Sequence, residues 1–267
     1  MRYLGVLGKM PTSFINPVQY RLQLGADLVA MNELLNRRIS LRFTGSIFCT
    51  VCGKKTYKSF GEGLCYNCFA TAADNAECIL RPELCLAHEH KGRDVDWELR
   101  NHLQPHFVYL ALVNEIKVGV TRSTQIPTRW IDQGANRAII LAETPYRQIA
   151  GLIEVSLKEF LSDKTHWSKM LRNEFNAAIV LEEEKQRIRE LMPEPLRQYF
   201  SANNEIVELQ YPVTVYPEKV KSIGFDKQPE INAVLTGIRA QYLMFEGGQV
   251  FNVRKHSGYE VELIAQD

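Results

Sequence analysis

The sequence predicts an α+β protein with a small mixed sheet flanked by helices, a zinc-ribbon module, and β-rich segments at the N- and C-termini. Three observations predict this class. Polar and apolar residues alternate near both ends, in Tyr20–Leu24 and Tyr259–Leu263, which is the period of a strand. All six cysteines lie between residues 49 and 85. The stretch 105–161 has the pattern of two strands followed by an amphipathic helix. We therefore divide the chain into segments 1–45, 46–103, 104–202 and 203–267.

The composition is that of an ordinary globular protein, with 45% hydrophobic and 24% charged residues. The net charge is +1, so any surface that binds a polyanion must be a local patch assembled by the fold. No apolar run approaches the roughly 20 residues that a membrane span needs. Met1–Met10 lacks the pattern of a signal peptide. We expect a cytoplasmic protein that does not associate with membranes.

Both terminal segments are expected to be built mainly from strands. In the first, Tyr20–Leu24 and Ile39–Phe43 alternate, whereas Asp27–Arg38 is interpreted as one helix. In the last, β-branched and aromatic residues are interrupted by glycines, which is typical of a meander. One interpretation pairs the two ends of the chain into a single β unit.

The first four cysteines have the spacing of two zinc knuckles. Cys49-x2-Cys52 and Cys65-x2-Cys68 are separated by twelve residues, and two such pairs hold one tetrahedral zinc in zinc ribbons. The alternatives are free buried thiols or a redox pair. Because a reducing cytosol disfavours structural disulfides, the pattern predicts a structural zinc site formed by Cys49, Cys52, Cys65 and Cys68.

A second metal site is suggested by the cysteines and histidines that follow. The simplest set of four ligands is Cys78, Cys85, His90 and His102; the alternative is two buried thiols and solvated histidines. Neither cysteine set has an adjacent activating carboxylate and an open position, so both are predicted to be structural zinc sites that stabilise a segment with little core of its own.

The middle segment carries a phenol, several cations and a carboxylate in a strand–turn–strand–helix order. Tyr109 is placed on the first strand, and Lys117 and Gly119 on the second, with a turn at Asn114-Glu115. Arg129 opens a short helix, and Glu154 lies in a helix over residues 145–161. Phosphodiester cleavage needs a base, cations that take up charge on the phosphorus, and help for the leaving oxygen. These residue types therefore predict a nuclease-like site.

The helix over 145–161 places Glu154 beside its apolar face, which consists of Ala150, Ile153, Leu157 and Leu161. We expect this helix and the one around Arg129 to pack across the face that Tyr109 and Lys117 share. A buried carboxylate is costly unless it meets a cation, so its partner should be a divalent metal or Arg129. A second helix is expected over 167–191 and ends before Pro193.

This order of residues resembles the GIY-YIG nuclease superfamily. The resemblance implies that Tyr109, Arg129 and Glu154 form the site, with Glu154 binding a single Mg²⁺ or Mn²⁺ and a tyrosine acting as general base. Lys117 stands where many members have a second tyrosine, and is expected to stabilise a Tyr109 phenolate. Thr121, Arg122 and Trp130 are the expected nucleic-acid contacts. The sequence departs from the superfamily because the glycine of the first motif is missing.

The chain as a whole resembles a bacterial family known as domain-of-unknown-function family 2797. The motifs that carry this resemblance include the Cys-x2-Cys-Gly opening, Pro82–Cys85, Val118–Arg122 and Pro127–Ala135. Members often carry cysteines near the positions of Gly92 and His102, which implies that His90 and His102 replace two ligands here.

Two functions are compatible with these residues. The first is a metal-dependent endonuclease that cleaves phosphodiester bonds in DNA or RNA through Tyr109, Lys117, Arg129 and Glu154. The second is a non-catalytic module that binds nucleic acid or a nucleoprotein. The complete set of polar residues favours the enzyme, whereas the near-neutral charge and the lack of a separate DNA-reading domain favour the binding module. Nucleic acid is the expected partner in both.

Overall fold

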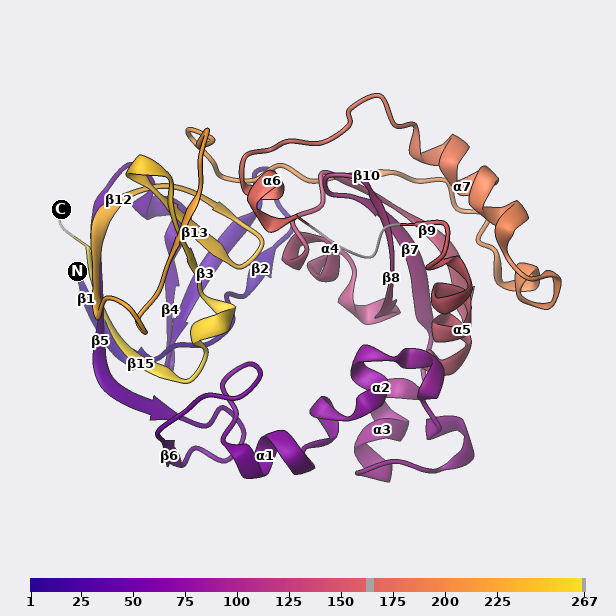
Figure 1. Cartoon of the computed structure of the whole chain (residues 1–267), viewed down its shortest axis with the longest axis horizontal. Coiled ribbons are helices and arrows are strands. Elements are labelled where there is room, and N and C mark those ends of the chain that lie inside the picture. Colours follow the sequence, from indigo (N-terminus) through magenta and orange to yellow (C-terminus); the bar gives the residue numbers. More distant parts are fainter. Residues whose placement is uncertain (162–165, 266–267) are drawn as a thin grey trace. The chain divides into compact units, whose positions relative to one another are not determined.

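The structure, a computed structural model, describes residues 1–161 and 166–265 (Figure 1). It divides into two compact units, which we call unit 1 (residues 1–70 and 210–267) and unit 2 (residues 71–209). The boundary at residues 70 and 71 falls inside the predicted segment 46–103. No helix within the described ranges is long and apolar enough to cross a membrane.

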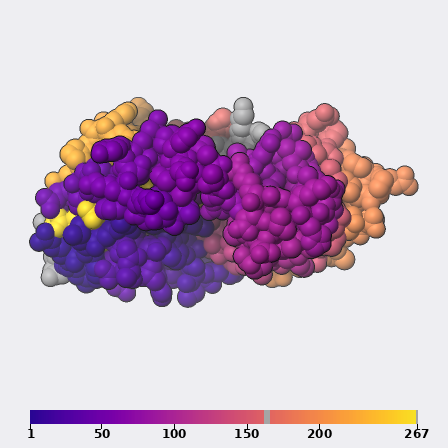
Figure 2. All heavy atoms as spheres, turned by 90° about the horizontal axis from the view of Figure 1, so that it is seen from below, coloured from indigo at the N-terminus to yellow at the C-terminus, as the bar shows by residue number. Residues whose placement is uncertain are grey.

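Unit 1 is built mainly from strands, and both ends of the chain contribute to its large sheet. The sheet has the order β1-β15-β5-β12-β13-β14-β11, and β6 pairs with β5. Its strands are β1 (Arg2–Val6), β5 (Arg38–Phe48), β6 (Lys55–Thr56), β11 (Lys221–Ile223), β12 (Glu230–Arg239), β13 (Tyr242–Phe245), β14 (Gln249–Asn252) and β15 (Tyr259–Ala265). The interpretation that pairs the two ends is confirmed, because β15 lies between β1 and β5. Figure 2 shows yellow C-terminal residues beside indigo N-terminal residues at the surface.

A smaller three-stranded sheet in unit 1 contains β2 (Thr12–Ser13), β3 (Gln19–Leu24) and β4 (Asp27–Ala30). The helix predicted over Asp27–Arg38 is wrong: this stretch forms β4 and the 3₁₀ helix η1 (Met31–Leu34). Gly25 has a φ of 60° in the turn between β3 and β4, a conformation that glycine adopts at no steric cost. The hairpin therefore forms in place of a helix.

Unit 2 contains a four-stranded sheet in the order β10-β9-β7-β8. Its strands are β7 (His106–Leu112), β8 (Ile116–Arg122), β9 (Arg137–Thr144) and β10 (Val207–Glu208). Every pairing in this sheet is antiparallel, so the predicted mixed sheet is wrong. The hairpin expected at Asn114-Glu115 is present and makes β8 antiparallel to β7.

Short helices surround this sheet. They are α2 (Glu77–Leu80), α3 (Val95–His102), α4 (Thr128–Asp132), α5 (Arg147–Leu157), α6 (Trp167–Leu171) and α7 (Leu181–Leu191), with 3₁₀ turns η2 (Ala73–Asn75), η3 (Pro82–Leu84), η4 (Ala87–Glu89), η5 (Ser123–Gln125) and η6 (Glu194–Tyr199). The remaining elements, α1 (Tyr66–Thr71), η7 (Glu246–Gly248) and η8 (Arg254–His256), begin in unit 1. Asn173 has a φ of 57° just after α6, so the single helix predicted over 167–191 is wrong.

The acidic run Glu182–Glu184 marks the start of α7, where it lies in the first turn. Negative side chains stabilise that end of a helix because the helix dipole is positive there. The single helix predicted over 167–191 would have placed this run in its interior. The run is instead a signal for where the second helix begins.

The core of unit 2 lies between one face of the sheet and α5. Val108 and Leu110 of β7 pack with Ala150, Ile153 and Leu157 of α5, and α5 lies along the sheet in Figure 1. This is the apolar stripe that the sequence predicted. Because successive residues of a strand point to opposite faces, Tyr109 faces away from α5, toward Trp130 of α4.

Helix α5 also packs tightly against η3, and a glycine makes this possible. A Cβ at Gly151 would lie 2.1 Å from the backbone nitrogen of Glu83 and 2.4 Å from the carbonyl carbon of Pro82. Both atoms belong to the main chain and cannot move aside as a flexible side chain does. The close approach of η3 to α5 therefore requires glycine at this position.

We expect Gly151→Ala to lower the free energy of unfolding by about 1–3 kcal/mol, the usual cost of overpacking a closely packed site. The neighbouring side chain of Leu152 is 39% exposed, so Leu152→Ala is the matched control and should change stability much less. Urea denaturation followed by far-UV circular dichroism measures both. Equal stability of Gly151→Ala and wild type would contradict the close packing of η3 on α5.

Candidate functional site

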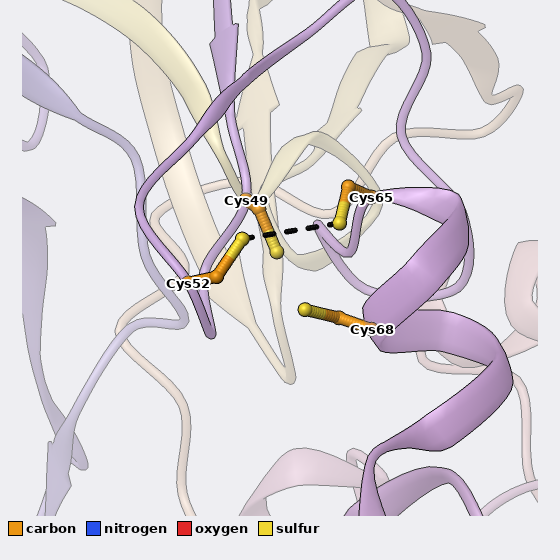
Figure 3. A group of neighbouring side chains, drawn as sticks. All are labelled: Cys49, Cys52, Cys65 and Cys68. Atoms are coloured by element: carbon orange, nitrogen blue, oxygen red, sulfur yellow. Dashed lines mark hydrogen bonds between the residues drawn. The ribbon is translucent and has the colours of Figure 1, made fainter.

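Four cysteines of unit 1 converge at the end of β5, as predicted. Cys49 directly follows β5, Cys52 lies in the following turn, and Cys65 and Cys68 lie at the start of α1. Gly53 closes the turn with a φ of 70°, and its N–H donates to the carbonyl of Cys49 at 2.9 Å. Figure 3 shows the four sulfurs pointing toward one another.

The geometry of this four-cysteine cluster fits zinc. All four sulfurs lie within 4.8 Å of one another, and those of Cys52 and Cys65 are 3.9 Å apart. Zinc–sulfur bonds of about 2.3 Å in a tetrahedron place the sulfurs about 3.8 Å apart. Burial opposes ionisation of Cys49, but N–H groups of Cys52, Cys65 and Val51 lower its pKa to about 6. A hydrogen bond with Cys65 raises the pKa of Cys68 to about 12, and burial adds to this rise. A bound cation would favour the thiolate form of all four cysteines.

A second group, in unit 2, consists of Cys78, Cys85 and His102. All three side chains are buried, and the Nδ1 atom of His102 lies 3.4 Å from the sulfur of Cys85 and 4.0 Å from that of Cys78. A hydrogen bond with Cys78 lowers the pKa of Cys85 to about 4. A deprotonated thiol, a second thiol and an imidazole form a donor set that zinc accepts. Both cysteine groups could therefore hold zinc.

His90 does not belong to this second group. It follows η4 in the left-handed conformation with a φ of 57° and is exposed to solvent. Of the predicted ligand set, the ligand atoms of Cys78, Cys85 and His102 lie together and could hold a metal, whereas His90 lies outside their group.

A cleft of about 230 Å³ lies along β8, which is the edge strand of the sheet in unit 2. It brings together three of the four predicted catalytic residues: Lys117, Arg129 and Glu154. It also contains three polar residues that the sequence analysis missed: Gln133, Arg147 and Lys158. The remaining lining consists of Ile79, Leu80, Pro82, Val118, Gly119 and Val120.

The cations of the cleft outnumber its carboxylates. Lys117, Arg129, Arg147 and Lys158 face a single carboxylate, that of Glu154. Helical spacing could have predicted that three of these residues lie together. Intervals of seven and four residues place Arg147, Glu154 and Lys158 on one face of a helix. This stripe lies beside the apolar stripe that did reveal the helix.

Tyr109, the fourth predicted catalytic residue, lies behind the wall of the cleft. It is fully buried, and its hydroxyl would lie 2.5 Å from a Cβ at Gly119. Gly119 lines the cleft, so it separates the phenol from the open space. The expectation that both helices cover the face shared by Tyr109 and Lys117 is wrong, since α5 packs on the opposite face. Glu154 reaches the cleft from that opposite side, at the edge of the sheet.

Several buried polar atoms near the cleft have no hydrogen-bond partner among residues 1–161 and 166–265. They include Nε of Arg129 and Oε1 of Gln133, which both belong to residues that line the cleft. Burial raises the pKa of Tyr109, and the nearby charge of Arg129 opposes that rise. Arg129 is thus the cation beside Tyr109, a role predicted for Lys117. Unpaired buried polar groups cost free energy, and a polar ligand in the cleft would offer them partners.

Burial also raises the pKa of Glu154, although Lys158, Arg147 and Arg129 act in the opposite direction. Glu83 adds to the rise because it is a second carboxylate nearby. The surrounding cations therefore do not compensate fully for the loss of hydration. A carboxylate in this state gains free energy when a further cation binds to it.

The three residues predicted to contact nucleic acid do not line the cleft. Thr121 and Trp130 are buried. The guanidinium of Arg122 donates a hydrogen bond to the side-chain oxygen of Asn101. The arginines that line the cleft are Arg129 and Arg147, and Arg122 is not among the lining residues.

A larger cavity of about 580 Å³ lies in unit 1 beside Cys49. The charged residues that line it are Lys9, Glu62 and Glu260, so its carboxylates outnumber its cations. This balance disfavours an anionic ligand. The cleft along β8 is therefore the better candidate for binding phosphate.

The chain is thus an α+β protein with a cysteine cluster that could hold zinc and a basic cleft at the edge of a small antiparallel sheet. The chain belongs to the family described as "Protein of unknown function (DUF2797)", whose model matches residues 36–261. This confirms the family resemblance found from the sequence, while the likeness to GIY-YIG nucleases stays a prediction. No curated protein and no solved structure matches the chain significantly.

We expect freshly purified, unchelated protein to contain zinc, and Cys49→Ser to lose about one equivalent. Binding energy at structural zinc sites is on the order of 10 kcal/mol in small peptides, so residues 46–70 should lose protection from amide hydrogen exchange. Tyr57 is fully exposed in the same segment, and Tyr57→Ala is the control that should keep its zinc. Unchanged zinc content in Cys49→Ser would count against the site.

Glu154→Gln should stabilise the metal-free protein relative to wild type, and increasingly so as the pH rises from 5 to 8. The raised pKa of Glu154 means that the folded state favours the protonated carboxyl. That contribution is fully present below the unfolded pKa and is lost as the pH rises through the folded pKa. Urea denaturation at each pH measures the difference, with the exposed Glu159→Gln as control. A difference independent of pH would contradict this.

Proposed function

We propose that unit 2 is a nuclease-like domain that hydrolyses phosphodiester bonds of DNA or RNA with the help of Mg²⁺ or Mn²⁺. One observation carries this proposal: a cleft lined by the cations Lys117, Arg129, Arg147 and Lys158 and by the carboxylate of Glu154. Cations attract the phosphate backbone, and a carboxylate among them is the oxygen donor that Mg²⁺ and Mn²⁺ prefer.

Glu154 fits the role of metal ligand. Its pKa is raised by burial in spite of the three cations nearby, so its environment lacks part of the positive charge needed to hold it ionised. A divalent ion would supply that charge, polarise a phosphoryl oxygen and lower the pKa of a bound water. Glu154 in turn would hold the ion at the edge of β8.

The two arginines fit the role of phosphate ligands. Arg147 uses Nε and Nη2 to donate to the carbonyl oxygens of Cys78 and Ile79, which fixes the plane of its guanidinium and leaves Nη1 for a ligand. Arg129 has an unpartnered Nε within the described part of the chain. Planar guanidinium groups bind phosphate oxygens in pairs, so these arginines are suited to stabilise charge that develops on phosphorus.

Tyr109 fits a positioning role better than that of a general base. A base must be deprotonated and must reach the proton that it accepts, whereas this phenol is fully buried and burial raises its pKa. It lies near Arg129, whose charge acts on it. We propose that Tyr109, packed on Gly119, orients Arg129 toward the cleft.

The alternative is a module that binds nucleic acid without cleaving it. The complete burial of Tyr109 favours this alternative, because it removes the implied base from the cleft while the cations remain. In that case, binding depends on Arg129 and Arg147, and the nucleic acid is not cleaved in the presence of divalent ions.

Cleavage of labelled single- and double-stranded DNA and RNA with Mg²⁺ or Mn²⁺ tests the proposal. Glu154→Gln should reduce the rate at least about 100-fold, in the range of a lost catalytic group, while binding at low salt persists because the cations remain. Arg129→Ala should lower both rate and affinity. Glu159→Gln and Arg187→Ala, exposed residues outside the cleft, are the matched controls and should behave as wild type.

Tyr109→Phe separates the two roles of the phenol. A general base would make this variant slower by about 10² to 10⁴, whereas a positioning residue should change the rate less and change the affinity in parallel with Arg129→Ala. Salt-sensitive binding without cleavage under either metal would support the binding module. If no nucleic acid binds even at low salt, both proposals are wrong.

A further inference from the structure

The chain around the four-cysteine cluster carries aromatic rings at its surface. Tyr66 and Phe69 lie on α1 and are 69% and 37% exposed. The ring of Phe60 contacts both of them, with its centroid 5.5 Å from that of Tyr66 and 5.9 Å from that of Phe69. We call Phe60, Tyr66 and Phe69 the aromatic surface. Single exposed apolar residues are ordinary, whereas exposed rings that contact one another mark a binding surface.

Lysines accompany these rings. The Nζ atom of Lys58 lies 5.2 Å from the centroid of the Phe60 ring, which is within the range of a cation–π contact. Lys54 and Lys55 are exposed shortly before it, in the turn that follows Cys52 and in β6. Three ammonium groups therefore belong to the same short stretch of chain as the aromatic surface.

The two halves of the predicted segment 46–103 differ in charge. Residues 71–103, in unit 2, contain seven carboxylates and four lysines or arginines, whereas residues 46–70, in unit 1, contain three lysines and one glutamate. That glutamate, Glu62, forms an ion pair with Arg254 at 2.6 Å. The chain beside the aromatic surface is therefore basic, and a basic surface attracts a polyanion.

The cysteine cluster holds the lysines and the rings together. Cys52 precedes Lys54 by two residues, and Cys65 directly precedes Tyr66. The sulfurs of Cys52 and Cys65 are 3.9 Å apart, and Figure 3 shows their two segments on either side of the four sulfurs. The turn that leads to Lys54 therefore lies beside the start of α1. A zinc ion in the cluster would fix this arrangement, because metal binding at such sites stabilises the fold around it.

The kinds of side chain exposed here favour nucleic acid over an apolar partner. The large apolar side chains exposed among residues 49–70 are those of Val51, Tyr57, Tyr66 and Phe69, and three of these four are aromatic. Protein–protein interfaces are depleted in lysine. Surfaces that bind single-stranded nucleic acid instead combine cations along the backbone with rings on which the bases stack.

We propose that the aromatic surface binds single-stranded nucleic acid. Tyr66 and Phe69 stack on unpaired bases, and Lys54, Lys55 and Lys58 contact the phosphates. Every base has a flat face, so this stacking requires no particular sequence. Bases within a duplex already stack on one another and cannot make these contacts. Nucleic acid is also the ligand of the proposed function, and the value of this surface for cleavage rests on that proposal, but none of its residues lines the cleft along β8.

Fluorescence anisotropy of the zinc-loaded full chain with labelled oligodeoxythymidine, oligouridine and a DNA duplex is the first test. Tyr66→Ala should weaken the binding of single strands about 5- to 100-fold, the range for one lost stacking contact, and should leave the affinity for the duplex unchanged. Phe14 is 52% exposed in unit 1 and has no charged residue among positions 10–20, so Phe14→Ala is the matched control. Equal effects of the two variants, or equal losses for single strands and duplex, would overturn the proposal.

Two further substitutions of Tyr66 separate stacking from apolar contact. Tyr66→Phe keeps the ring and should bind single strands as wild type does. Tyr66→Leu keeps an apolar side chain without a ring and should bind as weakly as Tyr66→Ala. The side chain is mostly exposed, so none of these variants should unfold the protein. Wild-type affinity in Tyr66→Leu would show that the surface is not a platform for stacking.

Lys58→Gln tests the contacts with phosphate. In a plot of the logarithm of affinity against the logarithm of salt concentration, its slope should be smaller by about 0.7, the contribution of one phosphate contact on a single strand. Lys221 is an exposed lysine on β11 of the same unit, and Lys221→Gln should keep the wild-type slope. The same slope in Lys58→Gln and wild type would contradict the role of Lys58.

Photochemical cross-linking of the wild-type protein to a single strand that contains 5-bromouracil locates the contact directly. Mass spectrometry should find the cross-link within residues 58–69. Cleavage without a cross-link there would overturn this proposal and leave the proposed function standing, whereas a cross-link there without cleavage would do the reverse. Vesicles that contain phosphatidylserine test the competing partner. Binding of these vesicles but not of the single strand would identify the ligand as a lipid surface and overturn the proposal.

Discussion

The hydrogen bonds of Arg147 to two carbonyls are the interaction on which the site of unit 2 depends. Its guanidinium is partly buried, which lowers its pKa, and this burial is tolerated because the carbonyls of Cys78 and Ile79 replace lost water. Arg147 is also the first residue of α5. The same side chain thus fixes where the helix begins and where the cysteine-containing loop lies. Glu154 lies two turns further along α5, so the contact that fixes the start of the helix also fixes the position of Glu154.

The location of the cleft at the edge of a sheet explains how residues from both faces meet. Arg129 belongs to α4, which covers the face of Tyr109, whereas Glu154 belongs to α5, which covers the face of Val108. Within a sheet these side chains would be separated by its thickness. At β8 the sheet ends, so long side chains from either face can extend past the last strand. Gly119 stands between the cleft and Tyr109, which keeps a phenol close to the ligand without exposing it.

Elements with strong local patterns could be predicted from the sequence, and long-range placements could not. The apolar stripe of α5 and the knuckle spacing of Cys49 to Cys68 each depend on neighbours in the chain, and both were found. Tyr109 was placed on the right strand, but strand alternation alone did not tell which helix covers which face. Gln133 lies inside the motif Pro127–Ala135, but nothing in the sequence distinguishes it from a glutamine at the surface.

The interleaved pairing in unit 1 has a consequence for biosynthesis. Strand β15 contributes the last residues of the large sheet, yet it lies between β1 and β5, which are made first. These two strands cannot join through β15 until that strand has left the ribosome. Unit 2, by contrast, is continuous between residues 71 and 209 and can fold while translation continues. Since domains generally fold as units during synthesis, the inserted middle should fold first, and chaperones would have their longest opportunity to bind the unpaired N-terminal strands.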